Sequence, residues 1–454
     1  MTLSEFGRRL RAREVSAEEV TRTCLKRIAD DNPRLNAFIL VMDDDALEQA
    51  RQADRELAAG HDRGPLHGVP LSIKDLIDLR GTPTTAASRV REGHMAAHDA
   101  PALGHLRQAG AVFVGKTNLH EFAFGTTNED SAFGPARNPL DPERSPGGSS
   151  GGSAASVAAG MALASIGTDT GGSIRIPAAA CGIVGVKATY GEISTDGAVP
   201  LSRTLDHVGP LAQSVGDAAL IYRALLGTAP IKPLNPVPMA GLRLAVPRPY
   251  FCEVLDGEVR ERFEEALERL QSAGAVVDEV AVPHANDIVP IYLFLSLSDA
   301  AAYHRPTLDA VPERYTPPVR RRLELGRYLL AEDYVRALAG RDVLRREVDT
   351  ILSTHHAIAL PTLPIPAPRL GETGVKVGDT EQPVRSMMLR LTQLFNLTGH
   401  PAVALPCGAT TSGLPCSLQL VGARSATDTL LQVGLACEAQ IAGTLVPRSG
   451  GMGG

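Results

Sequence analysis

The chain has 454 residues, of which 44% are hydrophobic and 21% are charged, and its formal net charge is −6. This composition is typical of a folded globular protein and excludes disordered and collagen-like chains. Lysine and arginine are scattered along the chain rather than gathered into a basic stripe, so we expect no nucleic-acid partner.

The cysteines and the N-terminal residues bear on the compartment. The six cysteines lie far apart and form no C-x-x-C pair, so we expect reduced thiols buried in the core. The first residues are polar and charged and lack the apolar core of a signal peptide. Since no stretch is long and apolar enough to span a bilayer, we expect a cytoplasmic protein without membrane contacts.

Helical periodicity recurs along the chain. The first helix starts with a capping box, in which Ser16 is followed three residues later by Glu19, and we expect Pro33 to end it. Further helices are expected, in chain order, over residues 44–59, between residue 99 and Gly110, over 256–273, through most of 285–352 and over 428–440.

Short strands are expected between these helices, and the first of them is expected to be buried. They are apolar runs bounded by glycine, proline or polar residues, at 68–78, at 111–115, directly after Gly274, within 357–368, at 400–408 and at 416–422. The first of them holds Lys74. Because helices and strands alternate along most of the chain, we expect an α/β fold with a central sheet covered by helices on both faces.

Two glycine-rich segments lie close together, GGSSGGSAAS at 147–156 and GTDTGGSIRIP at 167–177. A flexible linker needs no particular neighbours, whereas each of these segments leads directly into an apolar run. Neither matches the phosphate-binding patterns G-x-x-x-x-G-K-[ST] and G-x-G-x-x-G. We therefore favour two tight turns that present serines and backbone N–H groups to a substrate.

The second segment contains the best candidate for a nucleophile. Ser173 follows TDTGG, where successive backbone N–H groups can converge on a developing oxyanion. A serine hydroxyl needs a base, but no histidine lies in a motif typical of a serine hydrolase, and there is no G-x-S-x-G elbow. Lys74, within VPLSIKDLI, is the better candidate because Ser–Lys pairs are a known variant of the catalytic triad.

The segments GVPLSIKD, GGSSGGSAAS and GTDTGGSIRIPAAACGIVGVK resemble the amidase signature family, whose members use a Ser–cis-Ser–Lys triad. The spacing also resembles that of the family, with 75 residues from Lys74 to Ser149 and 24 from Ser149 to Ser173. The resemblance covers about residues 3–440 and includes GKTNLHEFAFG, SAFGPARNP and LTGHPAVALP.

This resemblance implies the architecture of the whole chain. It implies the amidase signature fold, with a large central mixed β-sheet, in a single domain over residues 1–444. The catalytic core is expected at about 60–230, and a helix-rich, substrate-covering region at about 285–352. Residues 445–454 read LVPRSGGMGG, which fits a cloning remnant or a native end, so we exclude them from the fold.

The resemblance also implies the catalytic roles. Ser173 attacks the substrate carbonyl, and Ser149, preceded by a cis peptide bond from Gly148, relays the proton to Lys74. Lys74 must be neutral to act as a base, and burial under its apolar neighbours would lower its pKa to that end. The neighbouring Ser150 is the alternative for the bridging serine.

The same resemblance implies which residues surround the substrate carbonyl. The oxyanion is expected to bind the N–H groups of the loop residues Thr170, Gly171, Gly172 and Ser173. Glycine fits there because it lets the backbone approach closely, while Asp169 and Arg175 are expected to brace the loop. The substrate pocket is expected to have one wall at Ala123–Thr126, in which the small residues Ala123, Gly125 and Thr126 leave space beside the nucleophile.

No cofactor is implied by the resemblance. His94 and His98 have helical i, i+4 spacing but lack the glutamate of H-E-x-x-H, so we expect no metal site there. The expected partner is a small amide or carbamate substrate, and the expected assembly is a monomer or a homodimer.

Three functions are compatible with the triad. The first is a stand-alone hydrolase of a small carboxamide, anilide or carbamate. The second is the glutaminase subunit of a tRNA-dependent amidotransferase, and the third is a non-catalytic binding relative. Glutaminase subunits carry an aspartate that binds the amino group of glutamine, whereas the aligned position in this chain is occupied by Leu389. We therefore favour the stand-alone hydrolase, and the intact triad makes the third function the weakest.

Overall fold

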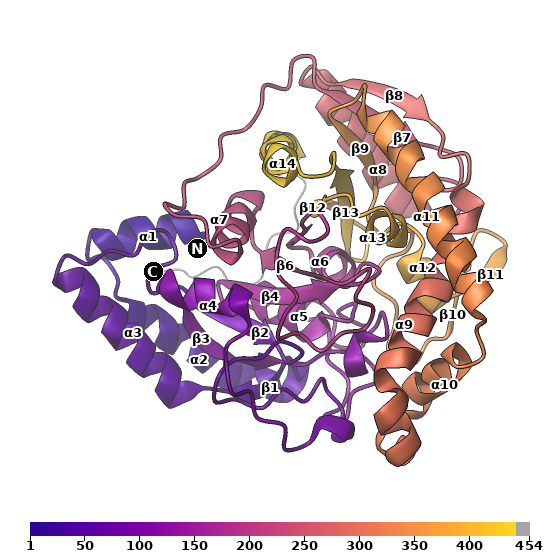
Figure 1. The fold of residues 1–454 in the computed structure, drawn as a ribbon. Coiled ribbons are helices and arrows are strands. Elements are labelled where there is room, and N and C mark those ends of the chain that lie inside the picture. The colour runs from indigo at the N-terminus through magenta and orange to yellow at the C-terminus, as the bar shows by residue number, and fades with distance from the viewer. Residues whose placement is uncertain (442–454) are drawn as a thin grey trace.

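The computed structural model describes residues 1–441, and most of its strands belong to one mixed sheet (Figure 1). These strands are β1 (Phe38–Val41), β2 (Pro70–Lys74), β3 (Val112–Thr117), β4 (Ala164–Asp169), β5 (Val184–Lys187), β6 (His207–Ala212), β7 (Arg243–Pro247), β8 (Val276–Val280), β9 (Ala357–Pro361), β12 (Ala402–Ala409) and β13 (Pro415–Val421). They lie side by side in the order β1-β3-β2-β4-β6-β5-β12-β13-β9-β7-β8. β10 (Gly374–Val377) and β11 (Thr380–Pro383) form a separate hairpin.

The sheet is parallel towards its two ends and antiparallel in the middle. β2 pairs in parallel with β3 and β4, and β7 pairs in parallel with β8 and β9. The strands from β4 to β9 pair antiparallel, and β1 adds an antiparallel edge. Every residue of β2 and β4 is buried, as expected for strands covered on both faces.

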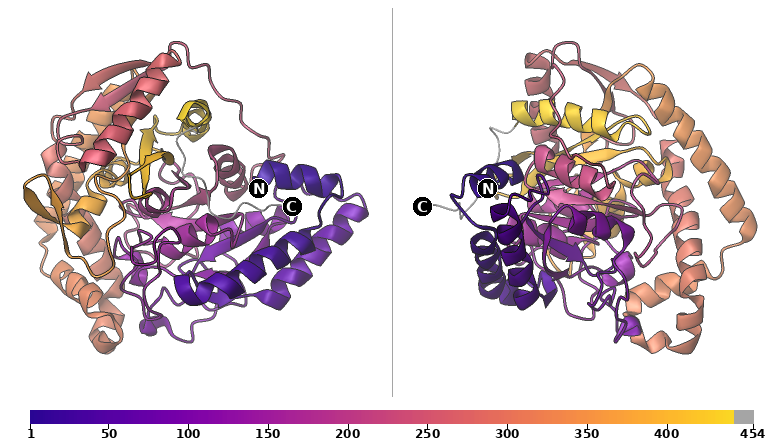
Figure 2. Two further views of the ribbon diagram at one scale, coloured as in Figure 1. Left: turned by 180° about the vertical axis from the view of Figure 1, so that it is seen from behind. Right: turned by 60° about the vertical axis from the view of Figure 1, so that its left-hand side comes forward.

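Helices cover both faces of this sheet (Figures 1 and 2). They are α1 (Leu3–Arg11), α2 (Ala17–Leu35), α3 (Asp43–Ala58), α4 (Pro101–Gln108), α5 (Gly151–Ala158), α6 (Arg175–Cys181), α7 (Val215–Leu225), α8 (Gly257–Ser272), α9 (Ile288–Ala310), α10 (Pro317–Gly326), α11 (Ala331–Leu352), α12 (Val384–Leu389), α13 (Gln393–Leu397) and α14 (Thr427–Ile441). The predicted α/β fold with a large central mixed sheet is confirmed.

The start of the first predicted helix is confirmed, but its end is wrong. The Ser16 hydroxyl accepts the Glu19 N–H at 3.0 Å, and the Glu19 carboxylate accepts the Ser16 N–H at 2.8 Å. α2 then continues through Pro33 to Leu35. A proline removes one helical hydrogen bond, whereas burial of Leu35 and the left-handed cap at Asn36, with φ of 48°, hold the last turn together.

Both glycine-rich segments are buried turns rather than linkers. Every residue of 147–156 and of 167–177 is buried. The first turn leads into α5 and the second connects β4 to α6, so both lie against the central strands. The expected tight turns are therefore confirmed, and they meet beside the end of β2.

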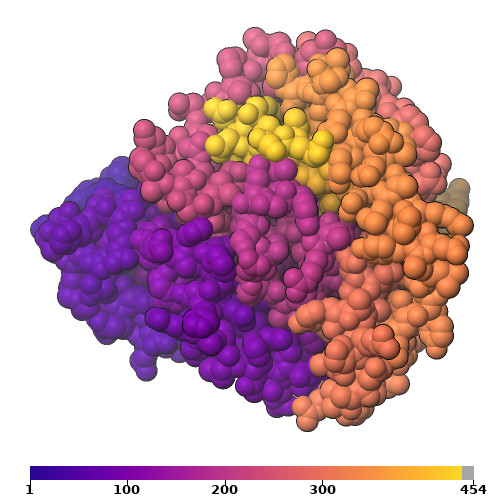
Figure 3. Space-filling model, viewed as in Figure 1, coloured from indigo at the N-terminus to yellow at the C-terminus, as the bar shows by residue number. Residues whose placement is uncertain are grey.

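The helix-rich region forms one side of the molecule. α9 contacts α10, α11 and α13, and in Figure 3 the salmon and orange residues of this region border the purple and magenta residues of the core. No helix within residues 1–441 has the length and apolar character that crossing a membrane requires. The single-domain boundaries stay a prediction, and residues 445–454 lie outside the described part of the chain.

Candidate active site

Lys74 is the last residue of β2 and lies next to both glycine-rich turns. Side chains alternate along a strand, and Ser72 points towards α5, where its hydroxyl lies 2.8 Å from that of Ser156. Lys74, two residues later, points the same way and is fully buried. Its Nζ donates to Ser149 Oγ at 2.7 Å and to Thr168 Oγ1 at 2.7 Å. The lysine therefore contacts hydroxyl groups rather than a carboxylate.

The surroundings of Lys74 set its charge. Burial lowers the pKa of Lys74 to about 7, although the more distant carboxylates of Asp169 and Asp206 oppose this shift. Lys74 has no ion pair within residues 1–441. Burial therefore favours the neutral Lys74 amine, which is the form that can accept a proton.

The peptide bond between Gly148 and Ser149 is cis, as expected. A Cβ on Gly148 would lie 2.9 Å from backbone atoms of Thr126, Thr127 and Asn128, so the close approach of these two segments requires glycine. The Ser149 carbonyl accepts the His120 N–H at 3.1 Å. Residues 120–128 therefore pack against the turn that carries Ser149.

Ser149 and Ser150 have different partners. The Ser150 hydroxyl donates to the Thr168 carbonyl at 3.1 Å, which ties the start of α5 to β4. Of the two, Ser149 is the serine whose hydroxyl contacts Lys74. The geometry thus favours Ser149 over Ser150 as the bridging serine.

Ser173 lies beside these residues at the end of the second turn. Its carbonyl accepts the Ser150 N–H at 3.3 Å, so the two turns are adjacent. Ser173 is 6% exposed, whereas Lys74 and Ser149 are fully buried, so Ser173 is the member of the set that can meet a substrate. Within residues 1–441 the Ser173 hydroxyl has no hydrogen-bond partner, so a direct bond to Ser149 is not formed in this structure.

Some backbone N–H groups of the loop before Ser173 are free to bind an oxyanion, and others already donate hydrogen bonds within the protein. The Gly171 and Ser173 N–H groups have no partner among the described residues, whereas the Gly172 N–H donates to Asp169 Oδ1 at 2.8 Å. The Thr170 hydroxyl donates to Asp206 Oδ1 at 2.5 Å. The N–H groups of Thr170, Gly171 and Ser173 thus have no partner within residues 1–441, and of the predicted four-residue oxyanion hole only the Gly172 donor is engaged.

Glycine is required at both central positions of this loop. Gly172 has a φ of +138°, and a Cβ there would lie 2.3 Å from Thr392 Oγ1. A Cβ on Gly171 would lie 2.3 Å from the Tyr292 hydroxyl and 3.1 Å from Leu389. The loop is therefore enclosed by α9, α12 and the start of α13.

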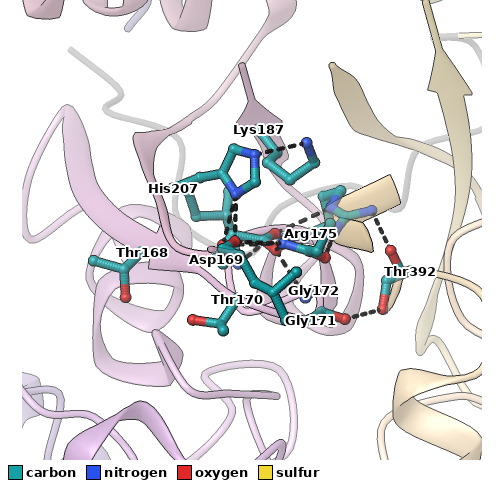
Figure 4. A network of polar contacts seen from close by, with 12 residues as sticks. Thr168, Asp169, Thr170, Gly171, Gly172, Arg175, Lys187, His207 and Thr392 are labelled. Atoms are coloured by element: carbon teal, nitrogen blue, oxygen red, sulfur yellow. Dashed lines mark hydrogen bonds and ion pairs between the residues drawn. The ribbon is translucent and has the colours of Figure 1, made fainter. Parts of the chain in front are cut away.

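Asp169 and Arg175 lie against the loop and hold it in place (Figure 4). The Arg175 guanidinium donates to both Asp169 oxygens at 3.0 Å, and also to Thr392, Gln419 and Asn396. Burial raises the pKa of the Asp169 carboxyl, but the Arg175 charge outweighs it and holds this pKa well below its usual range. Both residues are fully buried, so the pair fixes the loop and does not contact a substrate.

A second buried lysine, Lys187, appears in the same view (Figure 4). Its Nζ donates to the His400 carbonyl at 2.5 Å and lies 3.2 Å from His207 Nε2. Burial, helped by the Arg175 charge, holds its pKa well below the usual range. Lys187 contacts none of the three serines, so Lys74 is the buried lysine in position to act on one.

The expected pocket wall, residues 123–126, is buried and rigidly supported. Ala123 and Thr126 are 3% and 4% exposed. A Cβ on Gly125 would lie 2.0 Å from the His120 ring, so that ring fills the space behind the wall. His120 Nε2 lies 3.1 Å from Asp130, and burial lowers the pKa of His120 to about 4, so the ring is neutral at pH 7.

Sequence analysis missed several residues of the site. Thr168 gives Lys74 its second hydroxyl partner, Tyr292 covers Gly171, and Arg385 lies above the Phe124 ring at 5.8 Å. Each lies far in sequence from the residue it contacts. Tyr292 and Arg385 belong to no recognisable motif, whereas Thr168 lies within the second glycine-rich segment, which does not by itself show which of its side chains contacts Lys74. Leu389 was singled out through the family resemblance, and the structure places it against Gly171.

Metal ligands are not gathered in the described chain. Among residues 1–441, no group of three or more histidine, cysteine or acidic side chains is arranged to hold a metal ion. His94 and His98 do not lie in a helix, and His94 Nε2 is 3.9 Å from Asp78.

Comparison with known proteins extends over nearly the whole chain. The amidase family profile matches residues 19–431. The chain is 41% identical over 452 residues to an amidase of Pseudomonas putida, covering 96% of this chain and 95% of that protein. It is 38% identical over 477 residues to a glutamyl-tRNA(Gln) amidotransferase subunit of Carboxydothermus hydrogenoformans, covering 96% of each.

Solved structures show the same likeness. A crystal structure of an amidase superimposes with a TM-score of 0.92 at 40% identity, covering 97% of this chain and 100% of that one. The peptide amidase PAM in complex with the competitive inhibitor chymostatin superimposes with a TM-score of 0.85 at 30% identity, covering 99% of each chain.

Proposed function

The chain belongs to the amidase family and hydrolyses amides, and we propose that it is a stand-alone hydrolase of a small carboxamide, anilide or carbamate. The observation that carries this proposal is the 2.7 Å contact between Lys74 Nζ and Ser149 Oγ. It joins a base of lowered pKa to a hydroxyl beside Ser173, the one of the three that is not completely buried.

The proposed reaction starts with attack of Ser173 Oγ on the substrate carbonyl carbon. The Ser173 proton passes to Ser149 Oγ while the Ser149 proton passes to Lys74 Nζ. The carbonyl oxygen becomes an oxyanion that the free N–H groups of Gly171 and Ser173 stabilise. The C–N bond then breaks as the same relay returns the proton to the leaving nitrogen.

Water completes the cycle through the same groups. A water molecule attacks the acyl carbon and gives its proton to the relay, and the Ser173 oxygen leaves and takes the proton back. A carbamate follows the same path, because its acyl-enzyme differs by one oxygen. The Ser173 side chain must turn towards Ser149 for this relay, and substrate binding is the step at which we expect the contact to form.

The alternative is a glutaminase subunit of a tRNA-dependent amidotransferase, as the relative from Carboxydothermus hydrogenoformans is named. Leu389 argues against it, because an apolar side chain against Gly171 leaves the ammonium of glutamine without a partner. The stand-alone hydrolase needs no partner protein, and we propose a monomer or a homodimer.

Release of 4-nitroaniline from a small acyl anilide tests the proposal. We expect the wild-type protein to release it and Ser173→Ala and Ser149→Ala to lose the activity, with Ser150→Ala as the matched control that keeps it. Equal release by the wild type and Ser173→Ala would overturn the assignment of the nucleophile. No release from the anilide, together with ammonia release from glutamine, would favour the glutaminase.

A further inference from the structure

One cation near the site lacks a partner. Arg385 lies in α12 and is half-buried, yet its guanidinium has no hydrogen bond and no ion pair within residues 1–441. It lies over the Phe124 ring, 5.8 Å from the ring centre. Arg390, on the same segment, donates to the Tyr250 carbonyl at 2.8 Å and stacks on the Tyr250 ring at 3.9 Å.

Arg385 lies beside the expected pocket wall, in a helix that also contacts the loop of residues 170–173 (the oxyanion loop). Phe124 belongs to the wall at 123–126, and the titratable groups that act on Arg385 are the Tyr292 phenol and the Asp130 carboxylate. The Tyr292 hydroxyl packs on Gly171, and so does Leu389. Because Arg385 and Leu389 are four residues apart in one helix, they share the face of α12 that is turned towards the loop.

The acidic group nearby is already used by another arginine. The Arg322 guanidinium lies 5.3 Å from the Phe124 centre, and it contacts Asp130 at 3.5 Å. Asp130 also contacts His120 at 3.1 Å. Both guanidinium groups lie near the Phe124 ring, but Arg322 alone contacts the Asp130 carboxylate, so the charge of Arg385 is not balanced by an ion pair.

An unpaired, half-buried guanidinium is costly unless an anion binds to it. Arginine presents a planar fork that matches a carboxylate in a bidentate hydrogen bond. Leu389 stands where a glutaminase carries an acidic residue for the ammonium, so α12 provides the Arg385 guanidinium but no carboxylate of its own.

We propose that Arg385 binds a carboxylate on the acyl part of the substrate and that the substrate is the monoamide of a dicarboxylic acid without an α-amino group. This inference rests on the proposed function, since it names the substrate class of the same site. The amide carbonyl would lie at the oxyanion loop, and the carboxylate would bind beside the Phe124 wall.

Three probes of similar length separate the charges. Glutaramate carries the carboxylate without the amino group, glutamine carries both, and pentanamide carries neither. We expect the wild type to release ammonia from glutaramate with a kcat/KM about 10- to 100-fold above that for pentanamide and glutamine, as a charge-assisted pair provides. Arg385→Met should bring the glutaramate/pentanamide ratio close to one, mainly through KM, and Arg385→Lys should restore part of it.

Arg390→Gln is the matched control, since this arginine already has its own partners and should leave the ratio unchanged. Calorimetry on Ser173→Ala gives a readout without turnover, in which glutaramate should bind at least about tenfold more tightly than pentanamide. The double variant Ser173→Ala/Arg385→Met should lose that difference. A wild-type ratio near one, or an unchanged ratio in Arg385→Met, would overturn the inference.

The two proposals fail differently. If the anilide is cleaved through Ser173 but glutaramate is not preferred, the substrate class is wrong and the hydrolase stands. If Ser173→Ala still cleaves every probe, the proposed function itself is wrong, and the preference for a carboxylate is then decided by calorimetry alone.

Discussion

Each face of the β2–β3 strand pair buries one lysine, and the two lysines have different kinds of partner. Ile73 is in register with Lys116 and Lys74 with Thr117, so Lys116 points away from the face that carries Lys74. Both side chains are fully buried. Lys116 forms an ion pair with Asp75 at 3.0 Å, whereas Lys74 contacts the hydroxyls of Ser149 and Thr168.

This difference shows that burial alone does not make a lysine a base. Burial lowers the pKa of both, but the Asp75 carboxylate favours the charged form of Lys116. Hydroxyl groups can accept from an ammonium or donate to an amine, so they leave Lys74 free to change its protonation state. Lys116 is therefore suited to stabilise the fold, and Lys74 is suited to transfer a proton.

Removing the amine of Lys74 should have the largest effect. We expect Lys74→Met to lower kcat/KM for an anilide by about 10⁴-fold or more, because the variant removes the base. Urea unfolding should show stability equal to or above that of the wild type, since methionine in a buried site costs no desolvation. Lys187→Met, which changes a buried lysine that contacts no serine of the site, should keep most of the activity. A Lys74→Met protein with near wild-type turnover would refute the role of Lys74.

Removing the amine of Lys116 should instead affect stability. Lys116→Met leaves the buried Asp75 unpaired, and we expect the free energy of unfolding to fall by about 3–5 kcal/mol. Urea denaturation measures this change, and activity per folded molecule should be retained. The double variant Lys116→Met/Asp75→Asn should recover part of the loss. A single variant as stable as the wild type would show that the ion pair contributes nothing.

The pH dependence of activity follows from Lys74. The proposed base is the neutral amine, and burial lowers the pKa of Lys74 to about 7. We therefore expect kcat/KM to fall about tenfold per pH unit below 7 and to level off above it, in initial rates on a neutral anilide. A profile that is flat between pH 5 and 9, which spans roughly two units on either side, would show that Lys74 does not titrate during catalysis.

Removing the hydroxyl of Ser150, next to Ser149, should have the smallest effect on activity. The Ser150 hydroxyl donates to the Thr168 carbonyl, so Ser150→Ala should cost about 1 kcal/mol of stability and less than about tenfold in rate. Thermal unfolding and the anilide assay measure the two quantities. A rate loss in Ser150→Ala as large as that in Ser149→Ala would mean that the hydrogen bonds do not distinguish the two serines.

Much of the site could be predicted because its motifs are local. The glycines at 147–148 and 171–172 are close to the serines they position, so their need for close backbone approach is visible in the sequence. The alternation of helices and strands likewise predicts the sheet and its covering helices. The predicted helix end at Pro33 is wrong, because helix propensity depends on the local sequence. The burial of Leu35, which extends the helix, depends on tertiary packing.

The sequence by itself determined the α/β fold, the two buried turns and the residues Lys74, Ser149 and Ser173 as the candidate triad. The tertiary structure alone decided which hydroxyls Lys74 contacts, that Ser150 donates to the Thr168 carbonyl, and that Arg385 has no hydrogen bond or ion pair within residues 1–441. The reason is physical: Thr168 lies 94 residues from Lys74, and whether a charge is paired depends on every element packed around it. No local pattern carries that information.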